Sequence, residues 1–427
     1  MSPVAVAAIV LLVFLFMRVP VFVSLLSASL AYFVMTPGIP PMIAGQRILA
    51  GVESIPLLAI PFFVCSGVFM NYSGVSHRVM NFADVMTGRM YGGLAQTNIL
   101  LSTLMGGLSG SNLADAAMEA KMLVPEMERK GFSKEFSSVI TATSAMITPL
   151  IPPGIAMIIY GSIANVSIGK LFVAGIGVGL LLTATMMLLT SVLSRRRGYA
   201  RSRTTRLTGH EIWQAVKPAI LPLLLPIIII GGIRLGVFTP TEAGAVAIVY
   251  SILLGLLYRE MTPRNFFQGV KETIVSTSSI MVIIGAASAF AWILTREQIP
   301  QKLTATMVSV VDNKWVFLVL INLFLLLVGM FIEGNAAMIV LVPLLAPMAA
   351  NYGLDEIHFA MIFIFNMAIG ALSPPMGTLM FVTCAITKCP IGSFIREAVP
   401  YYLMLAGTLA LLVLFPVFSI GLVNLIY

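Results

Sequence analysis

The sequence predicts an all-α, polytopic membrane protein that is built from two repeats. Of its 427 residues, 59% are hydrophobic and only 10% are charged, so the chain has too few polar side chains to cover a soluble globule of this size. The apolar runs are rich in Leu, Ile, Ala, Met and Gly and lack the alternation of barrel strands, so they are expected to be helices. A third observation, the regular recurrence of prolines and glycines, predicts the repeat.

The repeat is clearest in two Pro-Pro elements that lie 222 residues apart, Pro152-Pro153 and Pro374-Pro375. Each element interrupts an apolar run that is long enough to cross a membrane, so two helices are expected to be broken at matching points. Paired breaks of this kind indicate the binding site of a transporter. Further pairs at the same spacing, or one residue more, are Pro125 with Pro347, Gly131 with Gly353, Asn112 with Asn335, and Ile168-Gly169 with Ile391-Gly392.

Prolines, glycines and charge clusters divide each half into similar elements. In the first repeat, residues 1 to 208, spans are expected near 3 to 17, 20 to 36, 54 to 71, 136 to 165 and 170 to 193. In the second, residues 209 to 427, they are expected near 218 to 237, 241 to 258, 272 to 294, 357 to 387 and 398 to 425. Amphipathic stretches, which either lie at the membrane interface or are ordinary connecting helices, cover 40 to 53, 75 to 90, 260 to 272 and 297 to 312.

Each repeat also contains a compound segment, 91 to 128 in the first and 315 to 350 in the second. Each has two apolar arms of about 15 residues, fewer than the roughly 20 that a crossing needs. The arms meet at a small polar cluster, around Ser109 in the first copy and Glu333 in the second. We interpret these segments as re-entrant hairpins whose tips lie inside the bundle. The alternative is a tilted pair of thin full spans.

The distribution of basic residues predicts the orientation. With the N-terminus outside, 19 Lys and Arg face the cytoplasm and 6 face outward, as the positive-inside rule requires. Arg18 and the linker block from Arg195 to Arg206 are among the inner ones. Because a hairpin enters and leaves on one face, the five true spans of each repeat reverse its direction. The second repeat is therefore expected to be inverted relative to the first, with both termini outside. The net charge of +8 is explained by the basic residues that set the membrane orientation, with a minor contribution from lipid headgroup contact, and does not indicate nucleic acid binding.

The breaks and tips predict sodium sites. An unwound turn frees carbonyl oxygens, and together with hydroxyl and amide oxygens these suit a hard monovalent cation. Two quasi-equivalent sites are expected, although Pro and Gly also serve simply to kink packed helices. The candidate sodium ligands are Ser109, Ser111, Asn112, Ser144, Thr148 and Pro149 in the first repeat, and Gly334, Asn335, Gly370, Ser373, Met376 and Thr378 in the second.

The same region is expected to bind an organic anion. Half-helices that begin at the cavity would present free backbone N–H groups and positive dipole ends to a carboxylate. Glu333 is a functional candidate because a carboxylate within the membrane is energetically costly and usually has a function. Asp115 and Glu119 lie at i and i+4 on one helix face. Their positions fit a role in capping and packing at least as well as a functional role. The candidate substrate residues are Asn112, Pro153, Gly154, Glu333, Asn335, Pro375 and Gly377.

These residues carry a resemblance to the large membrane subunit of tripartite ATP-independent periplasmic (TRAP) transporters. The matching signatures, in order, are Ile60-Pro61-Phe62-Phe63, Gly107 to Asp115, Ile151-Pro152-Pro153-Gly154, Phe238 to Ala243, and Ala368 to Gly377. The sequence departs from the family pattern at Asn112, at Gly154 and in the Glu333-Gly334-Asn335 tip. These departures leave the substrate open, with sialic acid slightly favoured over C4-dicarboxylates and other organic acids.

The resemblance implies sodium-driven uptake of an organic anion across a bacterial inner membrane. It also implies a small four-helix membrane partner subunit, a periplasmic solute-binding protein, and an elevator motion in which hairpins and broken helices move against a scaffold. The nearest alternative is a single-component sodium–carboxylate symporter. A membrane-bound enzyme and a passive channel are more distant, because no catalytic set is present and the hairpins would plug a path. No organic cofactor or transition metal is expected, because the three cysteines and three histidines are scattered.

Overall fold

The computed structural model describes residues 2–17, 19–40, 42–53, 55–199, 201–203 and 208–427. Arg18 and Arg206, two of the cations in the orientation argument, lie outside the described residues. Throughout the described ranges the regular structure is helical, as predicted. Six helices are long and apolar enough to cross a membrane, and the number rises to eight if two bent pairs each form one span.

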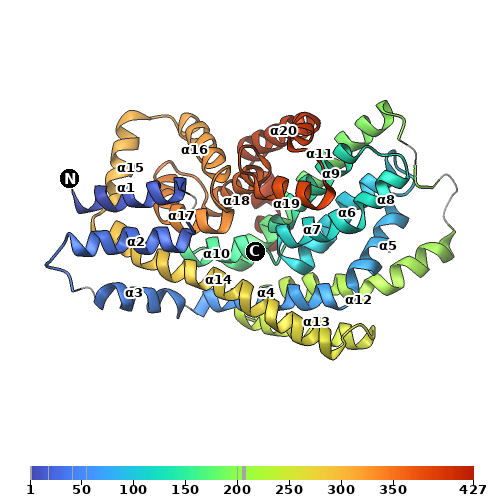
Figure 1. Ribbon diagram of the computed structural model, residues 1–427, viewed down its shortest axis with the longest axis horizontal. Coiled ribbons are helices and arrows are strands. Elements are labelled where there is room, and N and C mark those ends of the chain that lie inside the picture. The colour runs from blue at the N-terminus through green and yellow to red at the C-terminus, as the bar shows by residue number, and fades with distance from the viewer. Residues whose placement is uncertain (1, 18, 41, 54, 200, 204–207) are drawn as a thin grey trace.

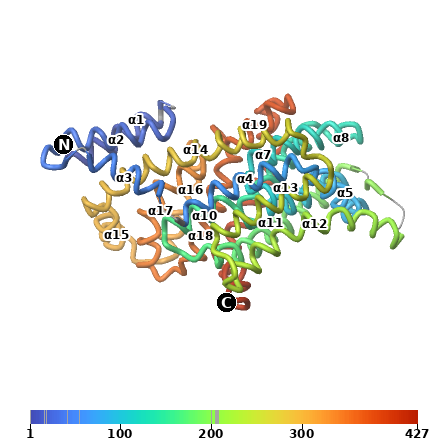
Figure 2. The backbone as a smooth tube through the Cα atoms, turned by 90° about the horizontal axis from the view of Figure 1, so that it is seen from below, coloured from blue at the N-terminus to red at the C-terminus, as the bar shows by residue number. Residues whose placement is uncertain are grey.

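One group of helices, which we call the scaffold, includes α3, α4, α13 and α14 along the lower part of Figure 1, and α1, α2 and α15 at its left end. Within it α4 packs against α13, and the long helix α14 packs against α2, α3 and α4. Figure 2 shows α1 and α2 at one end of the elongated molecule and α5 towards the other. The scaffold helices are α1 (Pro3–Phe16), α2 (Val21–Val34), α3 (Met42–Val52), α4 (Ala59–Tyr72, after the 3₁₀ turn η1, Ile55–Leu58), α5 (Val75–Thr87), α12 (Gly209–Arg234), α13 (Pro240–Leu257), α14 (Pro263–Arg296) and α15 (Ile299–Val310).

The other helices form what we call the hairpin unit, which holds both hairpins and both broken helices. The first repeat contributes α6 (Gly93–Ser109), α7 (Asn112–Met122), α8 (Val124–Arg129), α9 (Lys134–Ser144), the 3₁₀ turn η2 (Ala145–Leu150), α10 (Ile155–Ala164) and α11 (Ile168–Arg196). The second contributes α16 (Lys314–Gly329), α17 (Gly334–Asn351), α18 (Glu356–Leu372), α19 (Thr378–Thr387), α20 (Ile391–Leu414) and α21 (Val417–Ile426).

Each predicted hairpin segment contains two helices that meet at its polar tip, each predicted broken helix is interrupted at its Pro-Pro element, and the turns match between the repeats. The turn after each hairpin contains a glycine with a left-handed backbone, Gly131 at φ 87° and Gly353 at φ 66°, a conformation that glycine adopts without strain. Each broken helix also ends on a left-handed residue, Asn165 at φ 56° and Lys388 at φ 58°. Both Pro-Pro peptide bonds are cis.

Buried polar contacts repeat as well. In the first repeat the Oγ of Ser144 in α9 donates to the Oδ1 of Asn98 in α6 at 3.0 Å. In the second, the Nδ2 of Asn366 in α18 donates to the Oδ1 of Asn322 in α16 at 2.5 Å. Ser144 and Asn366 are 222 residues apart, the spacing of the Pro-Pro elements. Each hairpin is therefore fastened to the broken helix of its own repeat by a buried hydrogen bond between side chains.

The closest approaches between these helices repeat at the same positions. A Cβ atom on Gly106 would lie 3.0 Å from the Cα of Thr148, and one on Gly329 would lie 3.0 Å from the Cα of Gly370. Thr148 and Gly370 are again 222 residues apart. The absence of a side chain at Gly106 and Gly329 thus allows each first arm to lie against its broken helix.

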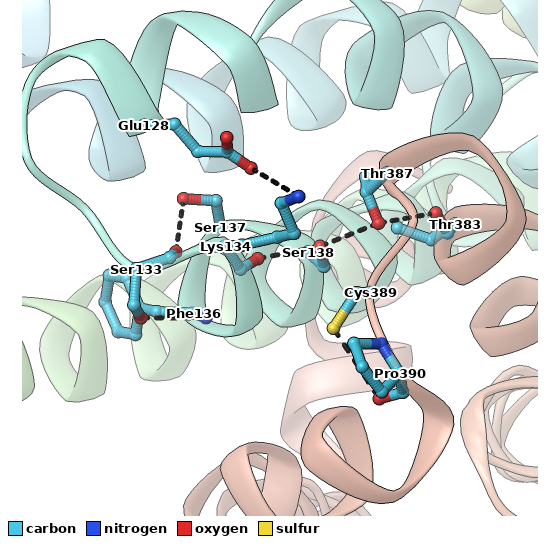
Figure 3. A network of polar contacts seen from close by, with 10 residues as sticks. All are labelled: Glu128, Ser133, Lys134, Phe136, Ser137, Ser138, Thr383, Thr387, Cys389 and Pro390. Carbon is cyan, nitrogen blue, oxygen red and sulfur yellow. Dashed lines mark hydrogen bonds and ion pairs between the residues drawn. The ribbon is translucent and has the colours of Figure 1, made fainter.

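The second arm of each hairpin packs against the other repeat. The arm α7 packs on α19, and the arm α17 packs on α10. Beside the first of these contacts, a polar network connects α9 to α19, in which the Oγ of Ser138 donates to the Oγ1 of Thr387 at 2.9 Å and Thr387 donates to the carbonyl of Thr383 at 2.9 Å (Figure 3). The two repeats are interlocked through their hairpins.

Two predicted elements differ from the structure, and two predicted spans are shorter than a full crossing. The amphipathic stretch 260 to 272 is not a separate helix, because α14 runs without a break over 34 residues from its Thr262 cap. The last span, predicted over 398 to 425, is divided between α20 and α21 near Pro416, whose ring cannot continue a helix. The helices α1 and α2 have 14 residues each, fewer than the roughly 20 of a full crossing.

Candidate substrate and cation site

A cavity of about 810 Å³ lies where the hairpin unit faces the scaffold, a size within the range of about 300 to 1,000 Å³ that is usual for ligand sites. Both hairpin tips, the start of α10, one face of α18 and the start of α19 line one wall. The helices α4 and α14 line the opposite wall. The tips of the two repeats, far apart in the sequence, thus meet in one space.

Four helices begin at this cavity. The first residues of α7, α10, α17 and α19 all line it, and they include Asn112, Ile155, Gly334 and Thr378. The first N–H groups of a helix lack partners within it, and the helix dipole places partial positive charge at the same end. Four such ends around one space favour an anionic ligand.

A buried carboxylate lies behind the first hairpin tip. The Oδ2 atom of Asp115 accepts hydrogen bonds from the Oγ of Ser109 at 2.6 Å and from the Oγ1 of Thr148 at 2.7 Å. This carboxylate therefore connects the end of α6, the first turn of α7 and the 3₁₀ turn of the broken helix. Ser109 and Thr148 were both predicted to bind sodium, and the structure brings them to the same carboxylate oxygen.

One helical turn away, Glu119 is buried in the same manner. Its Oε2 accepts a hydrogen bond from the Oγ of Ser102 at 2.7 Å. Neither Asp115 nor Glu119 has any exposed surface, and no donor in the described part of the chain forms a hydrogen bond with Asp115 Oδ1 or Glu119 Oε1. Among the described residues, neither carboxylate forms an ion pair with a basic side chain. Buried charge of one sign without a partner is costly, so this region favours a cation or protons.

The structure divides the other predicted site residues into three groups. Ser111, which caps α7, and Glu333, which caps α17 by accepting from the Ala336 N–H at 3.0 Å, line the cavity. Asn112, Pro149, Gly334, Asn335 and Thr378 also line it. Ser144 and Gly370 lie inside the packed helices, where they take part in the contacts between hairpin and broken helix described above.

The remaining predicted residues lie in the breaks and outside the lining of the cavity. The Oγ of Ser373 donates to the carbonyl of Ile369 at 2.8 Å, within its own helix. Ser373 also lines a second space of about 820 Å³, an apolar groove between α16 and α20. Pro153 and Gly154 immediately precede α10, whereas Pro375, Met376 and Gly377 immediately precede α19.

Sequence reasoning did not include the scaffold wall in the site. Asn71 of α4, together with Gln268, Lys271, Glu272 and Ser276 of α14, brings polar side chains to the cavity. The signal was present, because the α14 residues fall at the spacing of one helix face. It was missed because charges near the end of a span usually mark topology.

The fold and the cavity define a class: an all-helical, multi-pass membrane protein in which two hairpins and two broken helices line one wall of a cavity. A solved structure of similar architecture, the YdaH transporter of Alcanivorax borkumensis, superposes with a TM-score of 0.61 at 16% sequence identity and covers 88% of each chain. At that identity the likeness concerns the fold alone.

The chain belongs to the DctM component family of tripartite ATP-independent periplasmic transporters, whose family model matches residues 8–418. It is 39% identical over 407 residues to the sialic acid TRAP transporter large permease protein SiaM of Vibrio cholerae, and the match covers 95% of each chain. It is 38% identical over 377 residues to the C4-dicarboxylate TRAP transporter large permease protein DctM of Pseudomonas aeruginosa, covering 87% of each. Both relatives are named as permeases, which are transport proteins and not enzymes.

Proposed function

We propose that this protein is the large membrane subunit of a sodium-coupled transporter that takes up an organic anion across a bacterial inner membrane. The observation that carries the proposal is the convergence of four helix N-termini on one cavity between the two hairpin tips. These N-termini would hold a carboxylate by its oxygen atoms. The transported anion is a sialic acid or a C4-dicarboxylate, the substrates for which the two relatives are named.

Sodium would bind behind the first tip, where Ser109, Thr148 and Asp115 meet. The buried carboxylate supplies the negative charge, and the hydroxyl oxygens supply further hard ligands. A second sodium ion would bind at the quasi-equivalent tip, around Gly334, Asn335 and Thr378, which line the cavity. Both ions lie next to the helix N-termini, so their charge would strengthen the binding of the anion. This proximity provides the coupling.

In this proposal the hairpin unit moves against the scaffold as an elevator. The cavity reaches the end of the scaffold at which α4 finishes and α14 begins, where Gln268, Lys271 and Glu272 are exposed. The positive-inside rule places this end in the cytoplasm, so the structure would represent the inward-facing position. A small membrane subunit and a periplasmic binding protein, as in other members of the family, would complete the system.

Uptake into proteoliposomes tests the proposal. The purified protein, reconstituted with its small subunit, is given labelled sialic acid or succinate in the presence of the solute-binding protein. We expect uptake when sodium is outside and none when potassium replaces it. Equal uptake with potassium would exclude sodium coupling. Sodium-driven uptake without the binding protein would instead favour the single-component symporter.

A further inference from the structure

The scaffold wall of the cavity carries one positive charge that the proposed function does not use. The helix α14 presents Gln268, Lys271, Glu272, Val275, Ser276 and Ile280 to the cavity. Counted from Gln268, these residues lie at i, i+3, i+4, i+7, i+8 and i+12, so they occupy one face of the helix. Lys271 therefore faces the space at the hairpin tips from the opposite wall.

Among the residues that line the cavity, the charged ones are Lys271, Glu272 and Glu333. Both carboxylates already have partners in the protein. Glu272 accepts a hydrogen bond from the hydroxyl of Tyr72 at 2.6 Å, and Glu333 caps α17. Among the described residues, Lys271 forms no ion pair, and its side chain is exposed. Its ammonium group has three donors available for an anion.

We propose that Lys271 is a second contact for the transported organic anion, on the scaffold side of the cavity. This inference rests on the proposed function. The tips belong to the hairpin unit, whereas Lys271 belongs to the scaffold, so an elevator motion separates them. The anion then lacks the ammonium group of Lys271 when the cavity faces outward, and gains it when the cavity takes the position seen here.

A contact made in only one of two positions favours that position when ligand is bound. Lys271 thus determines the affinity for the anion at the inner face without changing it at the outer face. It also selects for ligands that carry an acidic or hydroxyl group within reach of the scaffold wall. Its role is to bind substrate, and sodium binding does not involve it.

The experiment measures affinity on each side of the membrane separately. Proteoliposomes contain graded concentrations of unlabelled sialic acid or succinate, whichever the wild-type protein transports, and sodium-driven uptake of the labelled compound is followed. The binding protein is supplied only outside, so that only molecules in the cellular orientation contribute. The internal concentration that halves uptake reports the inner affinity, and the external concentration of loaded binding protein that gives half-maximal uptake reports the outer one.

We expect Lys271→Gln to raise the internal half-inhibitory concentration about five- to tenfold, the scale of one charge-assisted hydrogen bond, and to change the external value less than about twofold. Lys271→Arg should retain the wild-type inner affinity, because it keeps the charge. Arg264→Gln is the matched control, because Arg264 is exposed on the same helix and does not line the cavity.

An unchanged inner affinity in Lys271→Gln would overturn the inference, as would an equal change on both sides. A loss of uptake in Lys271→Gln that Lys271→Arg does not rescue would also overturn it, because a structural role would then explain the effect. Failure of the proposed function is distinguishable, since the wild-type protein would itself show no sodium-driven uptake.

Discussion

Replacing Asp115 with asparagine tests the cation site most directly. The substitution keeps the shape of the side chain, and the amide oxygen still accepts hydrogen bonds from Ser109 and Thr148, which lie 2.6 and 2.7 Å from the present carboxylate oxygen. The only loss is the buried negative charge. We therefore expect Asp115→Asn to fold and to weaken the dependence of uptake on sodium.

The magnitude follows from the burial of the carboxylate. Two unit charges about 4 Å apart interact by about 4 kcal/mol at an effective dielectric constant of about 20. Removal of water from the ion and the carboxylate offsets part of this gain, which leaves about 1.5 to 3 kcal/mol. The sodium concentration that gives half-maximal uptake should therefore rise about 10- to 100-fold, since 1.4 kcal/mol corresponds to about tenfold.

The assay is a sodium titration of uptake into proteoliposomes, combined with thermal unfolding of the purified protein in sodium and in potassium. In potassium, Asp115→Asn should unfold at the wild-type temperature or above it, because it removes an unpaired buried charge. The stabilisation that sodium gives the wild type should shrink in the variant. Asp355→Asn, at an exposed helix cap, is the control. A folded Asp115→Asn protein with a half-saturating sodium concentration within twofold of the wild type would refute the reasoning.

Two further predictions concern the tips and the helix crossings. Ser109→Ala should raise the half-saturating sodium concentration about tenfold, the lower end of what one hydrogen bond to a charged group contributes. Ser373→Ala, whose hydroxyl donates within its own helix, should change that concentration less than about twofold in the same titration. Gly370→Ala would place a Cβ 2.5 Å from the Cα of Gly329 and should cost about 1 to 3 kcal/mol of stability. Gly392 lies in a helix, and a Cβ atom on it would have no other atom within 4 Å, so Gly392→Ala should not destabilise the protein. Equal melting temperatures for Gly370→Ala and Gly392→Ala would contradict this prediction.

The hairpins and the breaks could be predicted because the local sequence requires them. Pro152-Pro153 and Pro374-Pro375 lack backbone donors, so a helix cannot continue through them. Gly131 and Gly353 adopt the left-handed backbone that ends each hairpin. Features of this kind depend on neighbouring residues only, and their recurrence in the second repeat supports each interpretation independently.

The packing of α7 on α19 and of α10 on α17 could not be predicted in the same way, because it depends on contacts between residues distant in the sequence. The matching spacing of the repeats predicts that each hairpin tip lies near a break. It does not show which repeat the second arm of each hairpin contacts. Ser373 illustrates the limit: the sequence placed it in the break of α18, whereas its hydroxyl donates to its own helix and the residue lines the apolar groove.

Two residues have surroundings that the sequence did not predict. Asp115 suits the first turn of any helix, so its position after the tip favoured capping, and only the structure showed two hydroxyl groups directed at one of its oxygens. Lys271 was counted as a topology signal because it follows Arg259 and Arg264 in a basic stretch. Because α14 is continuous, this lysine lines the cavity, and no local sequence signal joins the stretch 260 to 272 to the span that follows.

The exchange of second arms between the repeats has a consequence for the origin of the fold. The two halves of the chain enclose the cavity together, because the second hairpin arm of each half also packs on the broken helix of the other half. A single ancestral copy would have needed a second copy beside it to form this surface. The present chain thus preserves, within one polypeptide, the interface between two copies of one structural unit.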